Sequence, residues 1–287
     1  MMKNLLYNIQ KLIVLVLIML GIQACSDDWQ EVGNAEVSFI ATLPIDTRAH
    51  SFGKAEQINT LVVGVFKKGG DDERINSEEN RNYYEIDRKK FSINGTTVDV
   101  QFTLAKEQTY SFIFWAYDSC LNIYNTSDLT AIKMNALPKS ITFEQSESID
   151  AFFSAEKDLI ITGNSTYSIE LVRPLAQINV GTTGTLMQAS FMAKSAPDTF
   201  YPFMNTVSGS TDYTWNFSNT TTETFSVNNE EYNYLVIGYL FAPVAGKKIA
   251  TELTLTDSEQ NSKMVEFSQV EIEANKRSNI VGNFTEE

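Results

Sequence analysis

The residues in this sequence that could do chemistry are two cysteines, one histidine and a few acidic or glycine-containing clusters. A Ser–His or Cys–His nucleophile pair would have to use His50, the single histidine. A zinc site with several histidines cannot form, and the acidic run at 71–79 lacks the spacing of an EF-hand calcium loop. Residues 181–184 lack the lysine of a phosphate-binding loop. The sequence predicts a protein that is not an enzyme, with no catalytic residues, metal or cofactor, although a carboxylate pair converging from distant strands stays open.

The N-terminus has the organisation of an export signal, residues 1–24. Lys3 and Lys11 precede a wholly apolar stretch at 12–20, and Gly-Ile-Gln-Ala at 21–24 ends in the small residue Ala24. The apolar stretch is shorter than the roughly 20 residues that a membrane-spanning helix needs. Residues 22–25, Ile-Gln-Ala-Cys, resemble the bacterial lipobox. This resemblance implies cleavage between Ala24 and Cys25 and attachment of lipid to the Cys25 thiol.

Lipid on Cys25 would decide where the protein is located. Each buried acyl CH2 contributes about 0.8 kcal/mol and one chain anchors only marginally, so the two or three chains of a bacterial lipoprotein would hold the protein stably. Residues 26–28, Ser-Asp-Asp, resemble the acidic patch of surface-exported lipoproteins of the Bacteroidetes, and the alternative is a solvated linker. We expect a surface-exposed lipoprotein of the cell outer membrane. Cys120 then has no disulfide partner and is expected to be a small, partly buried apolar residue.

Length and charge limit the class of protein further. The formal net charge is −14, and it becomes −16 when Lys3 and Lys11 leave with the signal. A chain this acidic is repelled by phosphate backbones, so we expect no nucleic acid among its partners. The residues after the signal suffice for two domains of ordinary size or one large all-β domain.

Most of the mature chain has the period of two that is typical of strands. Residues 98–104 alternate apolar and polar side chains, whereas residues 110–117 are apolar except for Ser111 and indicate a strand buried on both faces. Residues 251–256 and 264–272 predict a hairpin. Further strands are expected at 61–66, 168–172, 175–180, 213–217 and 234–241. Together these short strands favour β-sandwiches.

One helix and one domain boundary are also expected. Thr126 to Asp128 can cap a helix that starts at Leu129, and Asn135 and Pro138 would end it. The turn-rich residues 162–165 are the expected seam between two domains.

Five strings occur in an order that resembles one known family. The chain resembles the fimbrillin-type lipoproteins of the Bacteroidales, which include the subunits of type V pili. The strings are FIFWAYD at 112–118, DAFFSA at 150–155, LVRPLAQINVGT at 171–182, YLVIGYLFAPV at 234–244 and ANKRSNIVGNF at 274–284. The resemblance implies an all-β fold with two tandem transthyretin-like β-sandwich domains and one short helix in the first. The expected organisation is a signal peptide at 1–24, a lipidated pro-segment with the first strand at 25–48, and sandwiches at 49–165 and 166–287.

The resemblance also implies a proteolytic step between Arg48 and Ala49. The residues before this site alternate, so an edge strand of the first sandwich is expected there, with four side chains facing the core. These are Val37, Phe39, Ala41 and Leu43. Loss of this candidate displaced strand would open a groove that an extended segment of another subunit could fill by strand addition. Without the resemblance, Arg48 would be read as an ordinary solvated arginine.

The predicted function is that of a structural, tip or anchor subunit of a type V pilus that supports adhesion. Its partners would be other pilus subunits by strand addition, the outer membrane through the lipid, and a ligand on a host or bacterial surface. Because only residues 285–287 follow the last family string, little is left to donate, which favours a terminal subunit over a stalk pilin. The alternative is a monomeric surface lipoprotein that binds a glycan or a host protein.

Overall fold

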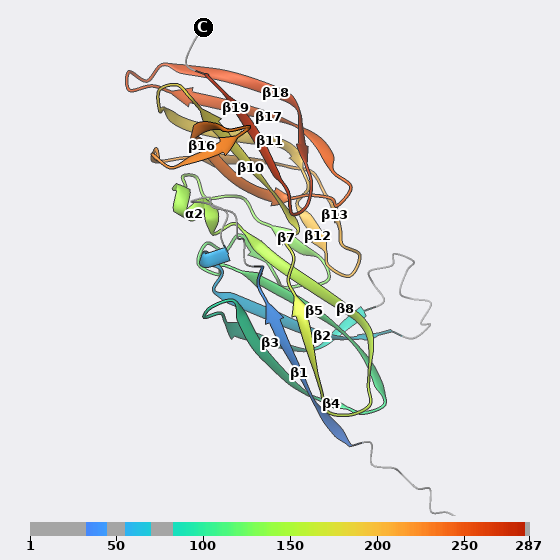
Figure 1. Ribbon diagram of the computed structural model, residues 1–287. Coiled ribbons are helices and arrows are strands. Elements are labelled where there is room, and N and C mark those ends of the chain that lie inside the picture. Colours follow the sequence, from blue (N-terminus) through green and yellow to red (C-terminus); the bar gives the residue numbers. More distant parts are fainter. Residues whose placement is uncertain (1–32, 45–54, 70–82, 285–287) are drawn as a thin grey trace, which may run out of the picture. The chain divides into compact units, whose positions relative to one another are not determined.

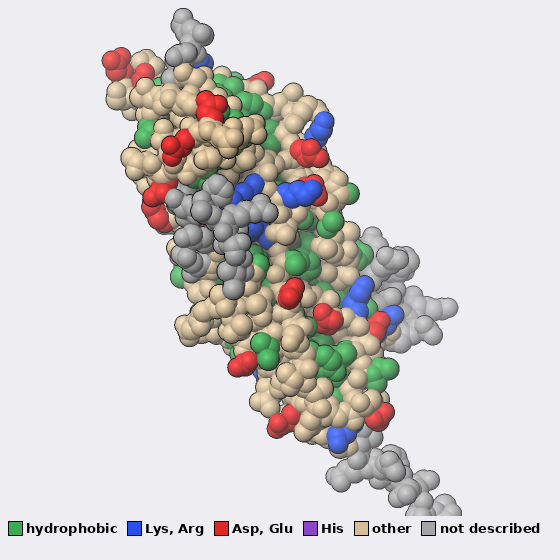
Figure 2. Space-filling model, viewed as in Figure 1, with side chains coloured by type: hydrophobic (Ala, Val, Ile, Leu, Met, Phe, Trp, Pro, Cys, Tyr) green, Lys and Arg blue, Asp and Glu red, His purple; other side chains and the backbone are tan. Residues whose placement is uncertain are grey.

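The computed structural model describes residues 33–44, 55–69 and 83–284, and Ala35–Glu287 form one compact unit. Strands make up most of the described chain (Figure 1), so the predicted all-β fold with tandem sandwiches is confirmed. No helix among the described residues is long and apolar enough to cross a membrane. On the face in Figure 2, acidic side chains are spread out rather than gathered in one patch.

The first sandwich consists of two sheets around one core. The smaller sheet has the order β4-β1-β9, with β4 at Thr97–Ala105, β1 at Asn34–Thr42 and β9 at Ser165–Glu170. The larger sheet has the order β3-β2-β5-β8, with β3 at Tyr83–Ser92, β2 at Thr60–Lys68, β5 at Gln108–Tyr117 and β8 at Ala151–Ile161. A 3-10 turn, η1 at Ala55–Gln57, precedes β2.

The second sandwich is built from the C-terminal strands. One sheet has the order β15-β16-β10-β19, with β15 at Thr224–Val227, β16 at Glu230–Phe241, β10 at Leu175–Thr182 and β19 at Arg277–Gly282. The other has the order β14-β11-β17-β18, with β14 at Thr211–Asn216, β11 at Gln188–Ala196, β17 at Lys247–Thr256 and β18 at Ser262–Ile272. The predicted hairpin is β17–β18, which ends at the pair Thr256–Ser262.

A small sheet joins segments from the two halves of the chain. Its order is β13-β12-β7-β6, with β13 at Thr206–Ser208, β12 at Thr199–Tyr201, β7 at Ile132–Met134 and β6 at Tyr124–Asn125. The pairing of β7 with β12 links residues that lie before and after the predicted seam at 162–165. The strand that directly follows this seam, β9, pairs with β1 in the first sandwich.

From Tyr110 to Tyr117, strand β5 is apolar except for Ser111, and both of its faces are buried there, as the sequence predicted. Phe112 and Phe114 point into the first core, a cluster of buried side chains drawn from residues 35–171. Ile113 and Trp115 point into the second core, which is drawn from residues 62–272 and includes the second sandwich. Because successive side chains of β5 point to opposite faces, this one strand contributes side chains to both cores.

The prediction of a helix after Thr126 is wrong, because this segment forms a turn followed by β7. The Asp128 carboxylate accepts hydrogen bonds from the backbone N–H and hydroxyl of Thr130, 2.8 and 2.7 Å away, and this bends the chain. Ile132 and Met134 are then buried on one side of β7.

The α-helix lies later, as α2 at Phe143–Glu147. Thr142 caps it, because its hydroxyl accepts from the Gln145 N–H while the Gln145 side chain accepts from the Thr142 N–H. The short helix is thus found, at a different place from the one predicted.

The turn after β5 contains a buried carboxylate and an exposed thiol. Cys120 is exposed, so the expectation that it is partly buried is wrong. Asp118 is the buried residue of this turn, and its Oδ1 accepts from Asn59 Nδ2 at 2.5 Å and from the Cys120 N–H at 2.9 Å. The hydrogen bond and negative charge of Asp118 raise the pKa of the Cys120 thiol, which disfavours the nucleophilic thiolate.

Asp118→Asn is expected to lower the free energy of unfolding by about 1–2 kcal/mol at neutral pH, because an amide accepts weaker hydrogen bonds than a carboxylate. Burial by itself raises the pKa of Asp118, but hydrogen bonds from Ser148, Cys120 and Asn59 outweigh burial and lower it overall. A pKa that is lower in the folded state stabilises above the unfolded value, and this contribution is lost as pH falls through the folded value. The difference between wild type and variant should therefore shrink below about pH 4.

Urea unfolding at several pH values measures this difference. Asp99→Asn, on the exposed side of β4, is the matched control and should change little at any pH. An effect of Asp118→Asn that is equally large in acid and at neutral pH would contradict the assignment of the stabilisation to the ionised carboxylate.

Candidate functional site

The candidate displaced strand is β1, and it is the central strand of its sheet. The sequence led us to expect an edge strand, which is wrong because β1 lies between β4 and β9 (Figure 1). It pairs with β9 in parallel, from Val37–Ser165 to Thr42–Glu170. A strand paired on both sides has no free edge, so its removal exposes two strand edges instead of one.

The alternation predicted for β1 is present in the structure. The side chains of Val37, Phe39, Ala41 and Leu43 are between 0 and 3% exposed, and all four belong to the first core. The intervening Ile40 is 38% exposed. One face of β1 therefore packs against the larger sheet, while the other faces outward.

Phe39 is the centre of the contact between β1 and the rest of the first core. Its ring centroid lies 4.6 Å from that of Phe112 and 5.2 Å from that of Phe114, both on β5. It also stacks on Tyr167 of β9 at 5.4 Å. These ring pairs add to the area that Phe39 buries.

Hydrogen bonds fix both ends of β1. At its C-terminal end, the Leu43 N–H donates to Thr96 O at 2.8 Å and the Leu171 N–H donates to Thr42 O at 2.9 Å. At its N-terminal end, the Glu36 N–H donates to Asn164 Oδ1 at 2.9 Å. The residues predicted to face the core are therefore held in one register along the whole strand.

Burial of β1 is a large part of the stability of the first sandwich. Burying a Val, Leu or Phe side chain contributes about 1.5–3 kcal/mol, so Val37, Phe39 and Leu43 together contribute roughly 5–9 kcal/mol. The entire net stability of a domain is about 5–15 kcal/mol. A first sandwich without β1 would therefore need another strand in its place.

The predicted processing sites lie outside the described residues. Ala24 and Cys25 precede β1 along the chain, and Arg48 and Ala49 follow it within 45–54. Because β1 lies between these two segments, a cut after Arg48 would separate β1 from every later strand. Only the contacts described above would then retain it.

A second feature, which the sequence analysis missed, is a polar pocket of about 430 Å3 beside β6. Three strand ends and a loop form it, so no single stretch of sequence indicates it beyond the clustering of Asn, Ser and Thr at 119–127. It is lined by Lys90, Tyr117, Ser119, Asn122, Tyr124, Asn125, Thr126, Ser127 and Asn135. Within the described part of the chain, no group of three or more His, Cys, Asp or Glu is placed to hold a metal ion.

Fold and site together define a tandem β-sandwich protein whose first strand fills the centre of a sheet. Residues 29–286 match DUF6562, a family of unknown function, and the chain belongs to this family. No curated protein matches the chain.

Several solved structures are similar to this chain at low identity. A candidate polysaccharide-binding protein from Bacteroides thetaiotaomicron is 12% identical with a TM-score of 0.47, over 82% of this chain and 80% of that chain. A candidate adhesin from Bacteroides ovatus is 12% identical with a TM-score of 0.47, over 85% and 79%. The tip fimbrial protein Mfa3 from Porphyromonas gingivalis is 12% identical with a TM-score of 0.41, over 82% and 81%. At such identities and TM-scores, these descriptions apply to those proteins alone.

Proposed function

We propose that the protein is a fimbrillin-like surface lipoprotein that acts as a subunit of a type V pilus and supports adhesion. The observation that carries the proposal is the position of β1 at the centre of its sheet. Along the chain, β1 follows the predicted lipid site at Cys25 and precedes the predicted cleavage site at Arg48. A single cut after Arg48 would leave such a strand held by non-covalent contacts alone, so that another strand could replace it.

Release of β1 would prepare the first sandwich for a partner. The cleft would be bordered by the free edges of β4 and β9 and floored by Phe112 and Phe114. An extended segment of another subunit would enter with its main chain paired to both edges and alternate side chains in the positions of Val37, Phe39 and Leu43. Assembly by this route needs no cofactor, because the cleft itself supplies the free energy of binding.

The same cut would decide whether the protein stays anchored. Lipid on Cys25 would hold the uncut chain at the outer membrane, and the segment that carries this lipid would leave with β1. A subunit that keeps β1 remains an anchor, whereas one that loses it becomes an acceptor in the fibre. Strand β19 pairs with β10 from Gln177 to Thr182, so it is engaged in its own sheet and is not a free donor strand.

An arginine-specific protease is expected to cut the purified full-length protein after Arg48 and to make β1 exchangeable. After the cut, a labelled peptide of residues 34–43 should replace the resident strand, because the same side chains fit the vacated cleft. Size-exclusion chromatography with fluorescence detection measures the exchange, and mass spectrometry locates the cut. The same peptide with Phe39→Asp should not bind, since a carboxylate would enter an apolar site.

Two protein variants control this experiment. Arg48→Ala should block both the cut and the exchange, while Arg74→Ala, which removes an arginine from the segment after β2, should block neither. A protein that is cut after Arg48 but never takes up the peptide or a partner subunit would refute strand exchange.

A second candidate function is that of a monomeric surface lipoprotein that binds a glycan or a host protein. The polar pocket beside β6 favours it, because a concave site lined by side-chain amides and hydroxyls suits a ligand rich in hydrogen-bonding groups.

A further inference from the structure

The polar pocket combines one cationic side chain with a wall of neutral polar groups. Lys90 of β3 stands on one side, and Asn122, Asn125 and Asn135 stand around β6 and β7. Ser119, Thr126 and Ser127 add hydroxyl groups. No carboxylate lines the pocket within the described part of the chain, although the whole chain carries a net charge of −14. Lys90 is thus the one charged side chain among the lining residues.

Alternation along β3 explains why Lys90 faces this pocket. Lys89 points to the opposite face of the strand, where its Nζ donates to Gln101 O at 2.7 Å and lies 4.6 Å from the centroid of the Phe102 ring. Arg88 and Lys90 therefore share the other face, toward the loop at 125–130. The two neighbouring lysines have the same charge and different surroundings.

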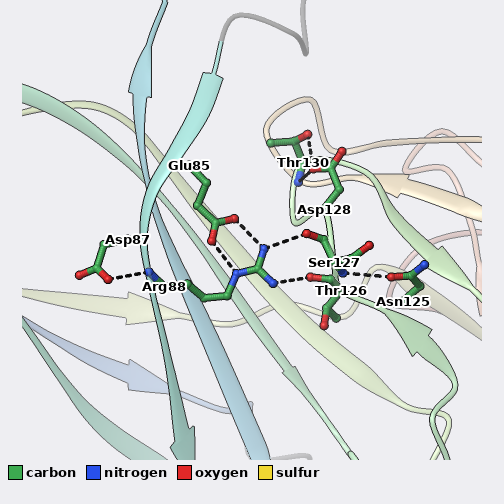
Figure 3. Close-up of polar contacts among 8 residues, drawn as sticks. All are labelled: Glu85, Asp87, Arg88, Asn125, Thr126, Ser127, Asp128 and Thr130. Carbon is green, nitrogen blue, oxygen red and sulfur yellow. Dashed lines mark hydrogen bonds and ion pairs between the residues drawn. The ribbon is translucent and has the colours of Figure 1, made fainter.

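Arg88 holds the loop that forms one wall of the pocket (Figure 3). Its guanidinium pairs with both carboxylate oxygens of Glu85, at 2.5 and 2.6 Å. It also donates to Thr126 O at 2.6 Å and to Ser127 O at 3.2 Å. The planar fork of arginine donors thus orients two pocket residues by their backbone.

Further hydrogen bonds fix the remaining walls. Asn125 Oδ1 accepts from the Ser127 N–H at 3.0 Å, and Asn135 Nδ2 donates to Asn122 O at 2.9 Å. The Ser119 N–H donates to Asn59 Oδ1 at 3.1 Å. The two tyrosines of the lining, Tyr117 and Tyr124, meet edge to face with ring centroids 6.1 Å apart. A pocket held in this way loses little conformational freedom when a ligand binds.

We propose that this pocket binds a short saccharide that carries a carboxylate, such as a uronic or sialic acid. Each side-chain amide offers donors and an acceptor, which match the adjacent hydroxyl groups of a sugar ring. Lys90 supplies the positive charge for the carboxylate, with no acidic lining residue to compete for it. The volume of about 430 Å3 lies in the range of small-molecule sites, and its polar lining suits a sugar better than an apolar ligand.

Titration calorimetry on the uncut full-length protein tests this assignment, with galacturonic acid, glucuronic acid and N-acetylneuraminic acid as probes and galactose as the neutral reference. At least one acidic sugar should bind about tenfold or more tightly than galactose, because a charge-assisted hydrogen bond to Lys90 is available to it. Lys90→Gln should remove that advantage. Asn125→Asp keeps the oxygen that accepts from Ser127 but adds a negative charge, so it should weaken binding of the acidic sugar by a similar factor.

Lys89→Gln is the matched control, since it removes the same charge from the adjacent residue on the opposite face and should leave the affinity unchanged. Thermal unfolding checks that the variants fold. Lys89, Lys90 and Asn125 are all exposed, so their substitution should leave the fold intact. The proposal is overturned if no acidic sugar binds, if galactose binds as tightly, if Lys89→Gln and Lys90→Gln weaken binding equally, or if a triglutamate peptide binds as well as the sugars. The pocket is complete in the uncut protein, so these results do not depend on release of β1.

Discussion

Replacing Phe39 with alanine is expected to lower the free energy of unfolding of the uncut protein by about 3–5 kcal/mol. The ring is fully buried among Phe112, Phe114 and Tyr167, and its removal leaves a cavity that rigid strands on both sides cannot close. Because β1 is held on both sides, the backbone should stay paired while the core loses its central contact. Chemical denaturation followed by circular dichroism measures the loss.

Ile40→Ala is the matched control for Phe39→Ala. Ile40 is the next residue of the same strand, points outward and is 38% exposed, so its truncation should cost less than about 1 kcal/mol. Equal effects of the two substitutions would mean that β1 does not pack against the core in this register. After cleavage at Arg48, Phe39→Ala should also speed the exchange of β1, because fewer contacts retain the strand.

Removing the charge of Arg173 is expected to lower the free energy of unfolding about as much as replacing Phe39 with alanine does. Arg173 Nε and one terminal nitrogen donate to the two carboxylate oxygens of Asp150, each at 2.7 Å. The Asp150 side chain is fully buried, and the guanidinium lies over the ring of Phe152 at 4.9 Å. Arg173→Met would leave a buried carboxylate without its partner, which typically costs about 3–5 kcal/mol.

The cost of Arg173→Met should depend on pH. Burial raises the pKa of Asp150, and the charge and hydrogen bonds of Arg173 oppose that rise in the wild type. In the variant burial acts with less opposition, so the folded pKa lies further above the unfolded one. A raised folded pKa means that stability is retained in acid and lost as pH rises through the folded value. The deficit of Arg173→Met relative to wild type should therefore grow from acid to neutral pH.

Lys276→Met is the control for this pair. Lys276 pairs with Glu273 at 2.7 Å, but its side chain is 64% exposed, so its loss should change the unfolding free energy by less than about 0.5 kcal/mol. Urea unfolding at acid and neutral pH compares the three proteins. If Arg173→Met behaves like Lys276→Met, the buried pair does not stabilise the fold.

The local parts of this fold could be predicted from sequence, because side-chain alternation is a local property. The alternating run at 98–104 is β4, and the apolar run at 110–117 is β5 with two buried faces. The expected helix after Thr126 failed because the spacing of Leu129 and Ile132 suits a helix as well as a turn followed by a strand. Pairing of β7 with β6 and β12 decided the outcome.

The order of strands could not be predicted, since it depends on residues far apart in the chain. Strand β1 became central because β9, more than one hundred residues later, pairs with it. The polar pocket was missed for the same reason, since only the fold brings together Lys90 of β3 and Asn135, which follows β7. The strings DAFFSA and LVRPLAQINVGT gave no hint that their residues Asp150 and Arg173 form a buried ion pair.

The parallel pairing of β1 with β9 has a mechanical consequence. When tension is applied between the N-terminal side of β1 and the second sandwich, the force acts on β1 at its first residues and on β9 at its last residues. In parallel strands these points are at opposite ends of the paired region, so the load shears all six pairs from Val37 to Thr42 at once. The strands would resist tension together instead of opening one pair after another. A surface protein tethered through its N-terminus could therefore bear force through β1 even after a cut at Arg48, until another strand takes its place.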